Sequence, residues 1–403
     1  MTRPTGTISL ALAALFVLPA LVTAEKLPYV YTKWKHFTTE DGLPNDHIFA
    51  VKVDGPRVWV GTENGLAMID KRTGKIKSWG EKDGLPFKVV TGIAVHPKTG
   101  DVWLALFGGG LARFSGGRFD HFHQLNSGLV NDVVYGVAIE NDNIWAATTA
   151  GANRYNTVSG EWTIFTEKNA PMEEIWNYAV DYSDGKVYLG VWGSGVLEYD
   201  VATGRWKDYL DPDKEMEIDL YRDDGIAHVI TTGVSYVDKI LWVSSYFGAS
   251  RYDGRKWRVF YNQDSGIPSD FQNNMKARSA IEAWYCTDKG LGAIMDFETN
   301  TWVAYTRDSK SLRGKAQVMK DKTVLEEIDM EMGVPHNFQI AIDFDGNDVW
   351  IGTGKGLGWG MGEGYYPGLK ERPPLTAAGK PGASKGAAKT VKVSSPLQEG
   401  GVE

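Results

Sequence analysis

One sequence pattern recurs along most of the chain and limits what it can fold into. The segment 58–66 reads Val-Trp-Val-Gly-Thr-Glu-Asn-Gly-Leu and returns as Val-Trp-Ile-Gly-Thr-Gly-Lys-Gly-Leu at 349–357. Insertions at 211–220 and 307–332 account for the two long gaps between copies, which otherwise follow one another about every 43 residues. The aromatic position of the pattern returns between these copies at Trp103, Trp145, Tyr188, Trp242 and Trp284. A period of this length indicates an array of small supersecondary units.

Each repeat contains the signals for four short strands. A Gly-Leu-Pro type turn opens the unit, as at 42–44, 84–86 and 266–268, and a Thr-Gly-x-x-Trp type turn lies near its end. The runs between these turns are short and rich in β-branched and aromatic residues, as hairpin strands require. Seven such units predict an all-β fold, a seven-bladed β-propeller over residues 33–367.

The two ends of the repeat array complement each other. The last unit, which starts at Val334, has three strand segments before Pro373, whereas 33–37 is a lone fourth-strand sequence that precedes the first Gly-Leu-Pro. We therefore expect the N-terminal strand to complete blade seven and to close the ring, which leaves no open sheet edge between the first and last blades.

The Gly-Leu-Pro-Asn opening, the Val-Trp-Val-Gly-Thr-x-x-Gly-Leu core and the Thr-Gly-x-x-Trp ending resemble the two-component regulator propeller repeat. Repeats of that family build extracytoplasmic sensor regions of hybrid histidine kinases and also occur in stand-alone exported proteins. The resemblance covers residues 33–367 and implies a stand-alone propeller. Any signalling by such a protein would take place through contact with a partner. The chain is also similar to stand-alone propellers of bacterial multihaem cytochrome systems, which implies such a system, or an extracytoplasmic sensor, as a partner.

The termini have compositions unlike the repeats. Residues 1–24 contain Arg3, an apolar run over 8–22 and a small-residue cleavage site, which predicts a cleaved signal peptide. The run is shorter than the roughly 20 residues that span a membrane. We expect a periplasmic or extracellular protein with no membrane span after cleavage. Residues 373–403 contain no aromatic side chain and are expected to form a disordered tail.

Charge and cysteine content exclude several classes of function. The chain has 51 acidic against 43 basic residues, a net charge of −8, so it has no basic stripe for nucleic acid. Its single cysteine, Cys286, and the absence of Cys-x-x-Cys or His-Glu-x-x-His patterns predict no metal and no cofactor. We expect a monomer.

Aligning the repeats places one residue after each Gly-Leu-Pro turn at a common position, the first column. Its members are polar in six of seven units, namely Asn45, Asn131, Glu173, His228, Ser269 and His336, with Phe87 as the exception. Asn and Ser favour turns, so capping explains Asn45, Asn131 and Ser269 well, with ligand contact as the alternative. The turn explanation is weaker for Glu173, His228 and His336, which are candidates for a polar site at the channel mouth.

The second column is aligned with Glu63, in the turn after the repeat core. Phe107, Trp192 and Tyr246 are aromatic at this position, where other units have small or charged residues. Departures from a local rule tend to mark functional surface. Aromatic faces suit sugar rings or the hot spot of a partner protein. The alternative is that they pack beneath the insertion at 211–220.

These columns predict a non-catalytic binding or scaffold protein that recognises a protein partner or glycan through the channel-mouth face. The alternative is a lyase or hydrolase in which His228 and His336 act as acid and base and Glu173 orients them, which requires the three side chains to converge. A sensor input module for a separate two-component kinase is a third interpretation.

Overall fold

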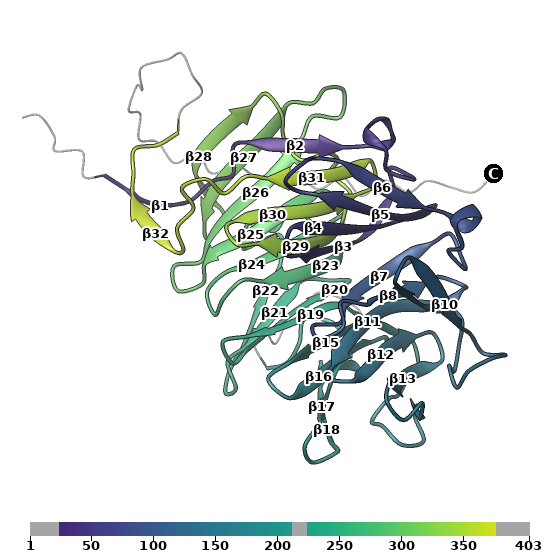
Figure 1. Ribbon diagram of the computed structural model, residues 1–403. Coiled ribbons are helices and arrows are strands. Elements are labelled where there is room, and N and C mark those ends of the chain that lie inside the picture. Colours follow the sequence, from purple (N-terminus) through teal and green to yellow (C-terminus); the bar gives the residue numbers. More distant parts are fainter. Residues whose placement is uncertain (1–23, 212–223, 376–403) are drawn as a thin grey trace, which may run out of the picture.

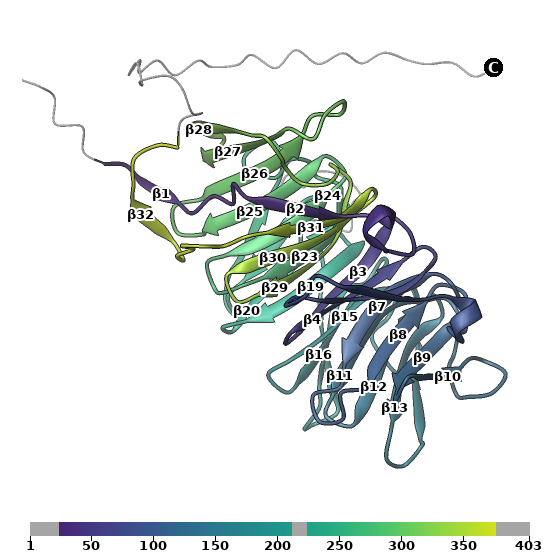
Figure 2. The same ribbon diagram turned by 45° about the horizontal axis from the view of Figure 1, so that its top comes forward.

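The computed structural model describes residues 24–211 and 224–375, and in this part of the chain seven antiparallel sheets surround a central channel (Figures 1 and 2). Each sheet is built from consecutive strands, as the repeat predicts. The first three blades contain β3 (Ile48–Asp54), β4 (Arg57–Thr62), β5 (Gly65–Asp70) and β6 (Ile76–Trp79); β7 (Val90–Val95), β8 (Val102–Leu106), β9 (Gly110–Ser115) and β10 (Arg118–Phe122); and β11 (Val134–Glu140), β12 (Asn143–Thr148), β13 (Gly151–Asn156) and β14 (Trp162–Phe165).

The next two blades and the start of the sixth follow the same order. They contain β15 (Asn177–Ser183), β16 (Lys186–Val191), β17 (Gly195–Asp200) and β18 (Arg205–Tyr209); β19 (Thr231–Val237), β20 (Ile240–Ser245), β21 (Ala249–Tyr252) and β22 (Trp257–Phe260); and β23 (Gln272–Ala277), β24 (Ala283–Thr287), β25 (Gly290–Asp296) and β26 (Thr301–Arg307). Two short 3₁₀ turns, η1 (Thr39–Asp41) and η2 (Glu81–Asp83), precede blades one and two.

Blade seven combines the two ends of the described chain. Its strands are β29 (Gln339–Asp345), β30 (Asp348–Thr353), β31 (Gly356–Gly360) and β2 (Trp34–Phe37). Strand β2 pairs antiparallel with β31, with Trp34 opposite Gly360 and Phe37 opposite Leu357. The innermost strands pack side by side in the order β3, β7, β11, β15, β19, β23, β29 and again β3. The predicted seven-bladed propeller and its closure by the N-terminal strand are both confirmed.

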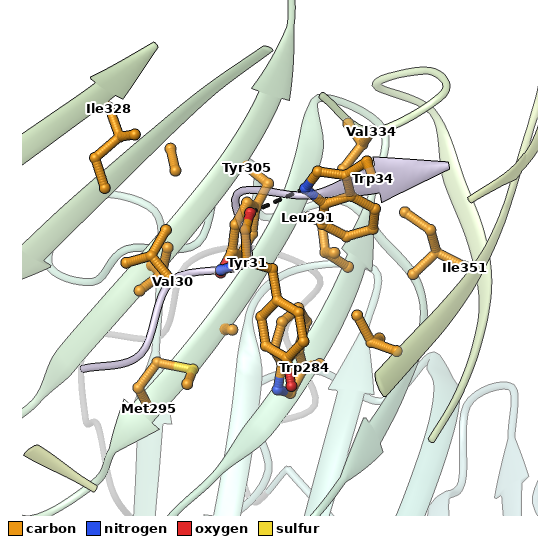
Figure 3. Packing of buried hydrophobic residues seen from close by; sticks show 14 of the residues in the cluster. Val30, Tyr31, Trp34, Trp284, Leu291, Met295, Tyr305, Ile328, Val334 and Ile351 are labelled. Atoms are coloured by element: carbon orange, nitrogen blue, oxygen red, sulfur yellow. Dashed lines mark hydrogen bonds between the residues drawn. The ribbon is translucent and has the colours of Figure 1, made fainter. Parts of the chain in front are cut away.

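The segment before β2 anchors this closure in the neighbouring blade (Figure 3). Tyr31 is buried and its ring lies edge-on to Trp284, 5.3 Å away between centroids. Trp34 packs against Tyr305 at 5.7 Å, and its indole N–H donates to the Tyr31 carbonyl at 3.0 Å. The N-terminal segment therefore ties blade six to blade seven through buried aromatic contacts as well as through the sheet.

The insertion at 307–332 extends a blade. Most of it forms β27 (Gly314–Lys320) and β28 (Thr323–Met330), which add two strands to the outer edge of blade six. Strand β1 (Lys26–Pro28), which precedes β2 in the chain, pairs with β32 (Leu369–Glu371), which follows β31. This two-stranded sheet lies at the left of Figure 1. Arg372, which follows β32, pairs with Glu326 of β28 at 2.8 Å.

Three of the sequence predictions fall largely outside the described residues. These are the signal peptide at 1–24, the insertion at 211–220 and the tail at 373–403. Within 24–211 and 224–375, no helix is long and apolar enough to cross a membrane.

The core lies between the blades. The aromatic residue of the repeat core is fully buried in blade after blade, for example Trp145, which stacks on Phe165 with ring centroids 5.1 Å apart. The glycine two positions after it permits close contact with the next blade. A Cβ atom on Gly61 would lie 2.6 Å from the Val90 carbonyl oxygen. The repeated Trp-x-Gly pattern thus encodes blade-to-blade packing.

Candidate binding site at the channel mouth

The first column forms the turns by which the chain enters the innermost strands. Asn45 Oδ1 accepts a hydrogen bond from the His47 N–H at 2.7 Å, and Asn131 Oδ1 accepts one from the Val133 N–H at 2.7 Å. Ser269 Oγ accepts from the Phe271 N–H at 3.3 Å. These side chains therefore stabilise the turn through the backbone two residues further on, as Asn and Ser commonly do.

The two histidines of the column make the same turn. Nδ1 of His228 accepts from the Ile230 N–H at 3.1 Å, and Nδ1 of His336 accepts from the Phe338 N–H at 3.1 Å. The imidazole Nδ1 is attached to Cγ, as Oδ1 of Asn is, so it reaches the same backbone group. The turn explanation, expected to be weaker for these histidines than for Asn and Ser, therefore applies to them as well.

Burial keeps these histidines neutral. His228 is 1% exposed, and burial lowers its pKa to about 4. Burial, followed by the nearby charge of Lys355, lowers the pKa of His336. With Nδ1 accepting a backbone hydrogen bond, the proton of each neutral ring is on Nε2.

Glu173 is exposed, and its backbone N–H donates to Ser194 Oγ at 2.8 Å. The carbonyl of Trp176 accepts from the Trp192 N–H at 2.8 Å, as the His47 carbonyl accepts from Glu63. Counted by this register, the residue of blade four that corresponds to Asn45 is Glu174, the neighbour of Glu173.

The three residues of the enzyme hypothesis belong to the entrances of different blades. Glu173 lies in blade four, His228 in blade five and His336 in blade seven. Among the described residues, those that line the two channel cavities include none of the three. The hydrogen bonds of the two histidines run to separate backbone groups. Their acid–base role stays a prediction.

The second column is one structural position in all seven blades. At each blade its backbone N–H donates to a carbonyl at the entrance of the innermost strand, with Phe107 bonded to Val89 at 3.0 Å and Tyr246 to Ile230 at 3.1 Å. This turn lies beside the start of the innermost strand. Phe107, Trp192 and Tyr246 are thereby held at the rim of the channel.

A β-bulge at the second residue of every innermost strand lines the mouth. The bulged residue is left out of the pairing with the second strand, and a bulge re-aims the side chain that it carries. These seven residues form the bulge ring, namely Phe49, Thr91, Tyr135, Tyr178, Thr232, Asn273 and Ile340. All seven line one cavity of about 360 Å³, together with Phe107, Tyr246 and Phe338.

Aromatic rings follow one another around this cavity from blade to blade. Phe107 lies 5.4 Å from Tyr135 between ring centroids, and Tyr135 lies 4.8 Å from Tyr178. Trp192 connects Tyr178, at 5.9 Å, with Tyr246, at 5.8 Å. Trp192 is half-buried and touches rings of the cavity without lining it, whereas Phe107 and Tyr246 form part of the wall itself.

The rim also carries the exposed aromatic residues. Within 24–211 and 224–375, the exposed aromatic side chains are Phe107, Trp176, Phe271 and Phe338, with 36% to 47% of their surface accessible. None of the four belongs to the bulge ring; they lie at the entrances or second-column turns of blades two, four, six and seven. Exposed apolar residues that gather in one place mark a binding surface.

Sequence reasoning missed the bulge ring and the exposed rim residues Trp176, Phe271 and Phe338. The ring offers hydrogen-bond donors as well as apolar surface. Burial, and then the neighbouring Tyr246, raises the pKa of Tyr178, and burial also raises the pKa of Tyr135. Both hydroxyl groups therefore remain protonated at neutral pH.

No group of three or more His, Cys, Asp or Glu side chains in the described part of the chain is arranged to hold a metal ion. His121 of β10 and His123, which follows the end of that strand, have rings 4.7 Å apart, and Nε2 of His121 is bonded to the Gly109 carbonyl at 2.8 Å.

Comparison with known proteins gives the fold. No family model and no curated protein sequence matches the chain. The extracellular domain of a hybrid two component system from B. thetaiotaomicron is similar in structure, with a TM-score of 0.60, 15% identity, and coverage of 85% of this chain and 42% of that one. A second such domain from B. thetaiotaomicron has a TM-score of 0.62 at 13% identity and covers 82% and 40%.

Virginiamycin B lyase from Staphylococcus aureus is also similar, with a TM-score of 0.58, 14% identity, and coverage of 81% of this chain and 97% of the lyase. The chain spans about two fifths of the length of the two extracellular domains and nearly all of the lyase. The propeller is thus shared by proteins of different activity, and the function has to be argued from the site.

Proposed function

We propose that this chain is an exported, non-catalytic binding propeller that captures a glycan or a protein partner at the channel mouth. The observation that supports the proposal is the aromatic rim around a concave cavity of about 360 Å³. Its lining residues include the apolar ring faces and also Tyr135, Tyr178 and Asn273, which carry polar groups; the Asn273 amide nitrogen donates to the Gln339 carbonyl at 2.7 Å. A mostly apolar concavity with a few polar groups is the usual form of a binding site.

The chemistry of the rim favours binding over catalysis. Sugar rings stack on aromatic faces, and tyrosine hydroxyls and an asparagine amide suit the hydroxyl groups of a sugar. An aromatic rim is equally suited to the apolar anchor of a protein partner. His228, in contrast, is buried and neutral, and its Nδ1 is occupied by a backbone hydrogen bond.

The proposed location is periplasmic or extracellular, with the sequence at 1–24 acting as the export signal. The similarity of the fold to extracellular domains of two component systems is in keeping with this location. A membrane-bound sensor kinase, or a multihaem cytochrome system, is a partner of the kind that a protein-binding rim would serve.

The test replaces Trp192 and Tyr246 by Ala, separately and together. Loss of a hot-spot aromatic weakens binding by about 2 kcal/mol or more, roughly 30-fold. We expect the variants to lose capture of a glycan or partner in pull-downs from native cells, while the melting temperature changes little. The matched control is Val158→Ala. Val158 is 80% exposed and lies in the turn between β13 and β14, at the end of the blade opposite to the mouth. Capture that survives both aromatic substitutions would refute the assignment of this face.

A further inference from the structure

A second ring of residues lines the channel below the bulge ring. It consists of the fifth residue of each innermost strand, namely Lys52, Ala94, Ala138, Asp181, Ser235, Lys276 and Asp343. All of these except Asp343 line a cavity of about 440 Å³. Phe49, Tyr135 and Tyr178 of the bulge ring line this deeper cavity as well as the mouth cavity, so the two adjoin.

Asp343 lies behind the wall and is fully engaged. It is buried, and its carboxylate accepts hydrogen bonds from the Val53 N–H at 2.8 Å and from the Phe344 N–H at 3.0 Å. It also forms an ion pair with Lys276, and the Lys52 ammonium lies 3.9 Å from its second oxygen. One buried carboxylate therefore holds two ammonium groups next to each other in the channel wall.

The single carboxylate of Asp343 balances one of the two ammonium charges, and Asp181 also attracts both lysines. Repulsion by Lys276 is the largest influence on Lys52 and lowers its pKa. About a third of each lysine side chain remains exposed, on the channel side. The third charge in the wall is Asp181 of blade four, and burial raises the pKa of its carboxyl group despite the nearby Lys276 and Lys52.

Charge and shape therefore differ between the two levels of the channel. The mouth is aromatic, whereas the deeper level presents two lysines and one carboxyl group, in a chain whose net charge is −8. Three residues along a strand separate the levels, which corresponds to about 10 Å. A ligand that uses both levels carries a ring at one end and an anionic group at the other.

We propose that the channel binds a ring-bearing carboxylate, with its ring against the mouth aromatics and its carboxylate between Lys52 and Lys276. The proposal rests on the proposed function and names the ligand class of the same site. The chemistry is shared by two sources, a short acidic glycan that ends in a uronic acid and an aromatic acid. A disaccharide matches the distance between the levels better than a single ring does.

The test measures binding of four probes to the full chain after export, by isothermal titration calorimetry. The probes are digalacturonate and its uncharged dimethyl ester, and benzoylglycine and its uncharged amide. We expect at least one acid to bind tenfold or more tightly than its uncharged counterpart, since the charged form of a hydrogen-bonded pair is the stronger one. Digalacturonate as the preferred acid would identify a glycan, and benzoylglycine would identify an aromatic acid.

Substitution of the lysines locates the carboxylate. Lys52→Met removes the ammonium group that is not in close contact with Asp343, and should abolish the preference for the acid. Lys276→Met is paired with Asp343→Asn, so that no buried carboxylate is left without its partner. Lys82→Met is the control, because Lys82 is exposed on η2 and lines neither of the two channel cavities.

The inference is refuted if neither acid binds better than its uncharged counterpart, or if Lys52→Met binds the acid as well as the native chain does. Failure of this inference and failure of the proposed function give different results. A glycan or partner that is lost on Tyr246→Ala but is retained on Lys52→Met leaves the mouth as the binding site and removes only the carboxylate.

Discussion

Acidification tests the buried state of His228 and is the sharpest prediction from the structure. Its Nδ1 is bonded to the Ile230 N–H, its Nε2 is buried without a hydrogen-bond partner among the described residues, and its ring packs against Phe247 at 5.5 Å. Protonation would add a second N–H and a positive charge to this ring. Among the described residues, no acceptor bonds Nε2, and Nδ1 faces the Ile230 N–H, which is itself a donor. The folded state therefore resists the proton that the unfolded chain accepts.

The sign and size of the effect follow from the two pKa values. Burial lowers the pKa of His228 from 6.5 in the unfolded chain to about 4 in the folded one. Above pH 6.5 the ring is neutral in both states, so His228 adds no pH dependence. Below pH 6.5 only the unfolded state binds the proton, and the free energy of unfolding falls until about pH 4. At 1.36 kcal/mol per pH unit, the loss is about 2 kcal/mol at pH 5 and about 3 kcal/mol at pH 4.

The assay is urea unfolding at a series of pH values between 7.5 and 4.5, for the native chain and for His228→Asn. Asn45 and Asn131 make the same turn at the equivalent position of other blades, so Asn preserves the hydrogen bond to the backbone and removes the titrating group. Carboxylates that titrate in the same range contribute equally to both proteins. The native chain should lose about 2 kcal/mol more than the variant between pH 7 and pH 5. Parallel pH profiles would show that His228 is not held neutral, and would reopen its role as an acid or base.

Two further predictions concern the architecture. Trp34→Ala empties a buried site between blades six and seven and should lower the free energy of unfolding by about 3 kcal/mol, measured by urea unfolding; an unchanged midpoint would contradict the anchoring role of the N-terminal segment. Gly233→Ala places a Cβ atom 2.7 Å from Ser244 Oγ and 2.8 Å from Asn274 Oδ1, and should cost about 2 kcal/mol in the same assay. Its control, Gly254→Ala, meets no atom within 4 Å and carries only the strain of its φ of 90°. Equal losses would show that the packing of blades five and six is looser than the structure indicates.

The repeat predicted the fold to the level of strand pairing because blade packing depends on the same few residues in every unit. The repeat positions of Trp145 and Gly61 serve blade-to-blade packing wherever they recur. Their recurrence was therefore enough to predict the number of blades. Closure by Trp34–Phe37 followed from the missing fourth strand of the last unit.

The site was only partly visible in the sequence. Phe107 and Tyr246 were identified because they are aromatic at a turn position where other repeats have small or charged residues. The residues of the bulge ring do not depart from any pattern of the repeat. Tyr135 and Thr232 are ordinary strand residues, and only the bulge turns them toward the mouth. A signal for the deeper level was present, since Lys52 lies between Val51 and Val53, and Lys276 lies between Met275 and Ala277, in innermost strands. Which charges meet across the channel depends on the order of blades around the ring, and single strands do not contain that information.

Closure of blade seven by β2 has a consequence for the order in which the molecule assembles. Blades one to six pair strands that are neighbours in the chain, and such local contacts form quickly. The contacts of the last blade connect positions as distant as Tyr31 and Asn347, which are 316 residues apart. Strand β2 is synthesised near the start of the chain but finds its partner β31 only near the end, and until then β31 has an unpaired edge. Because the entropy cost of closing a loop rises only with the logarithm of its length, this delay affects the rate of folding far more than the final stability.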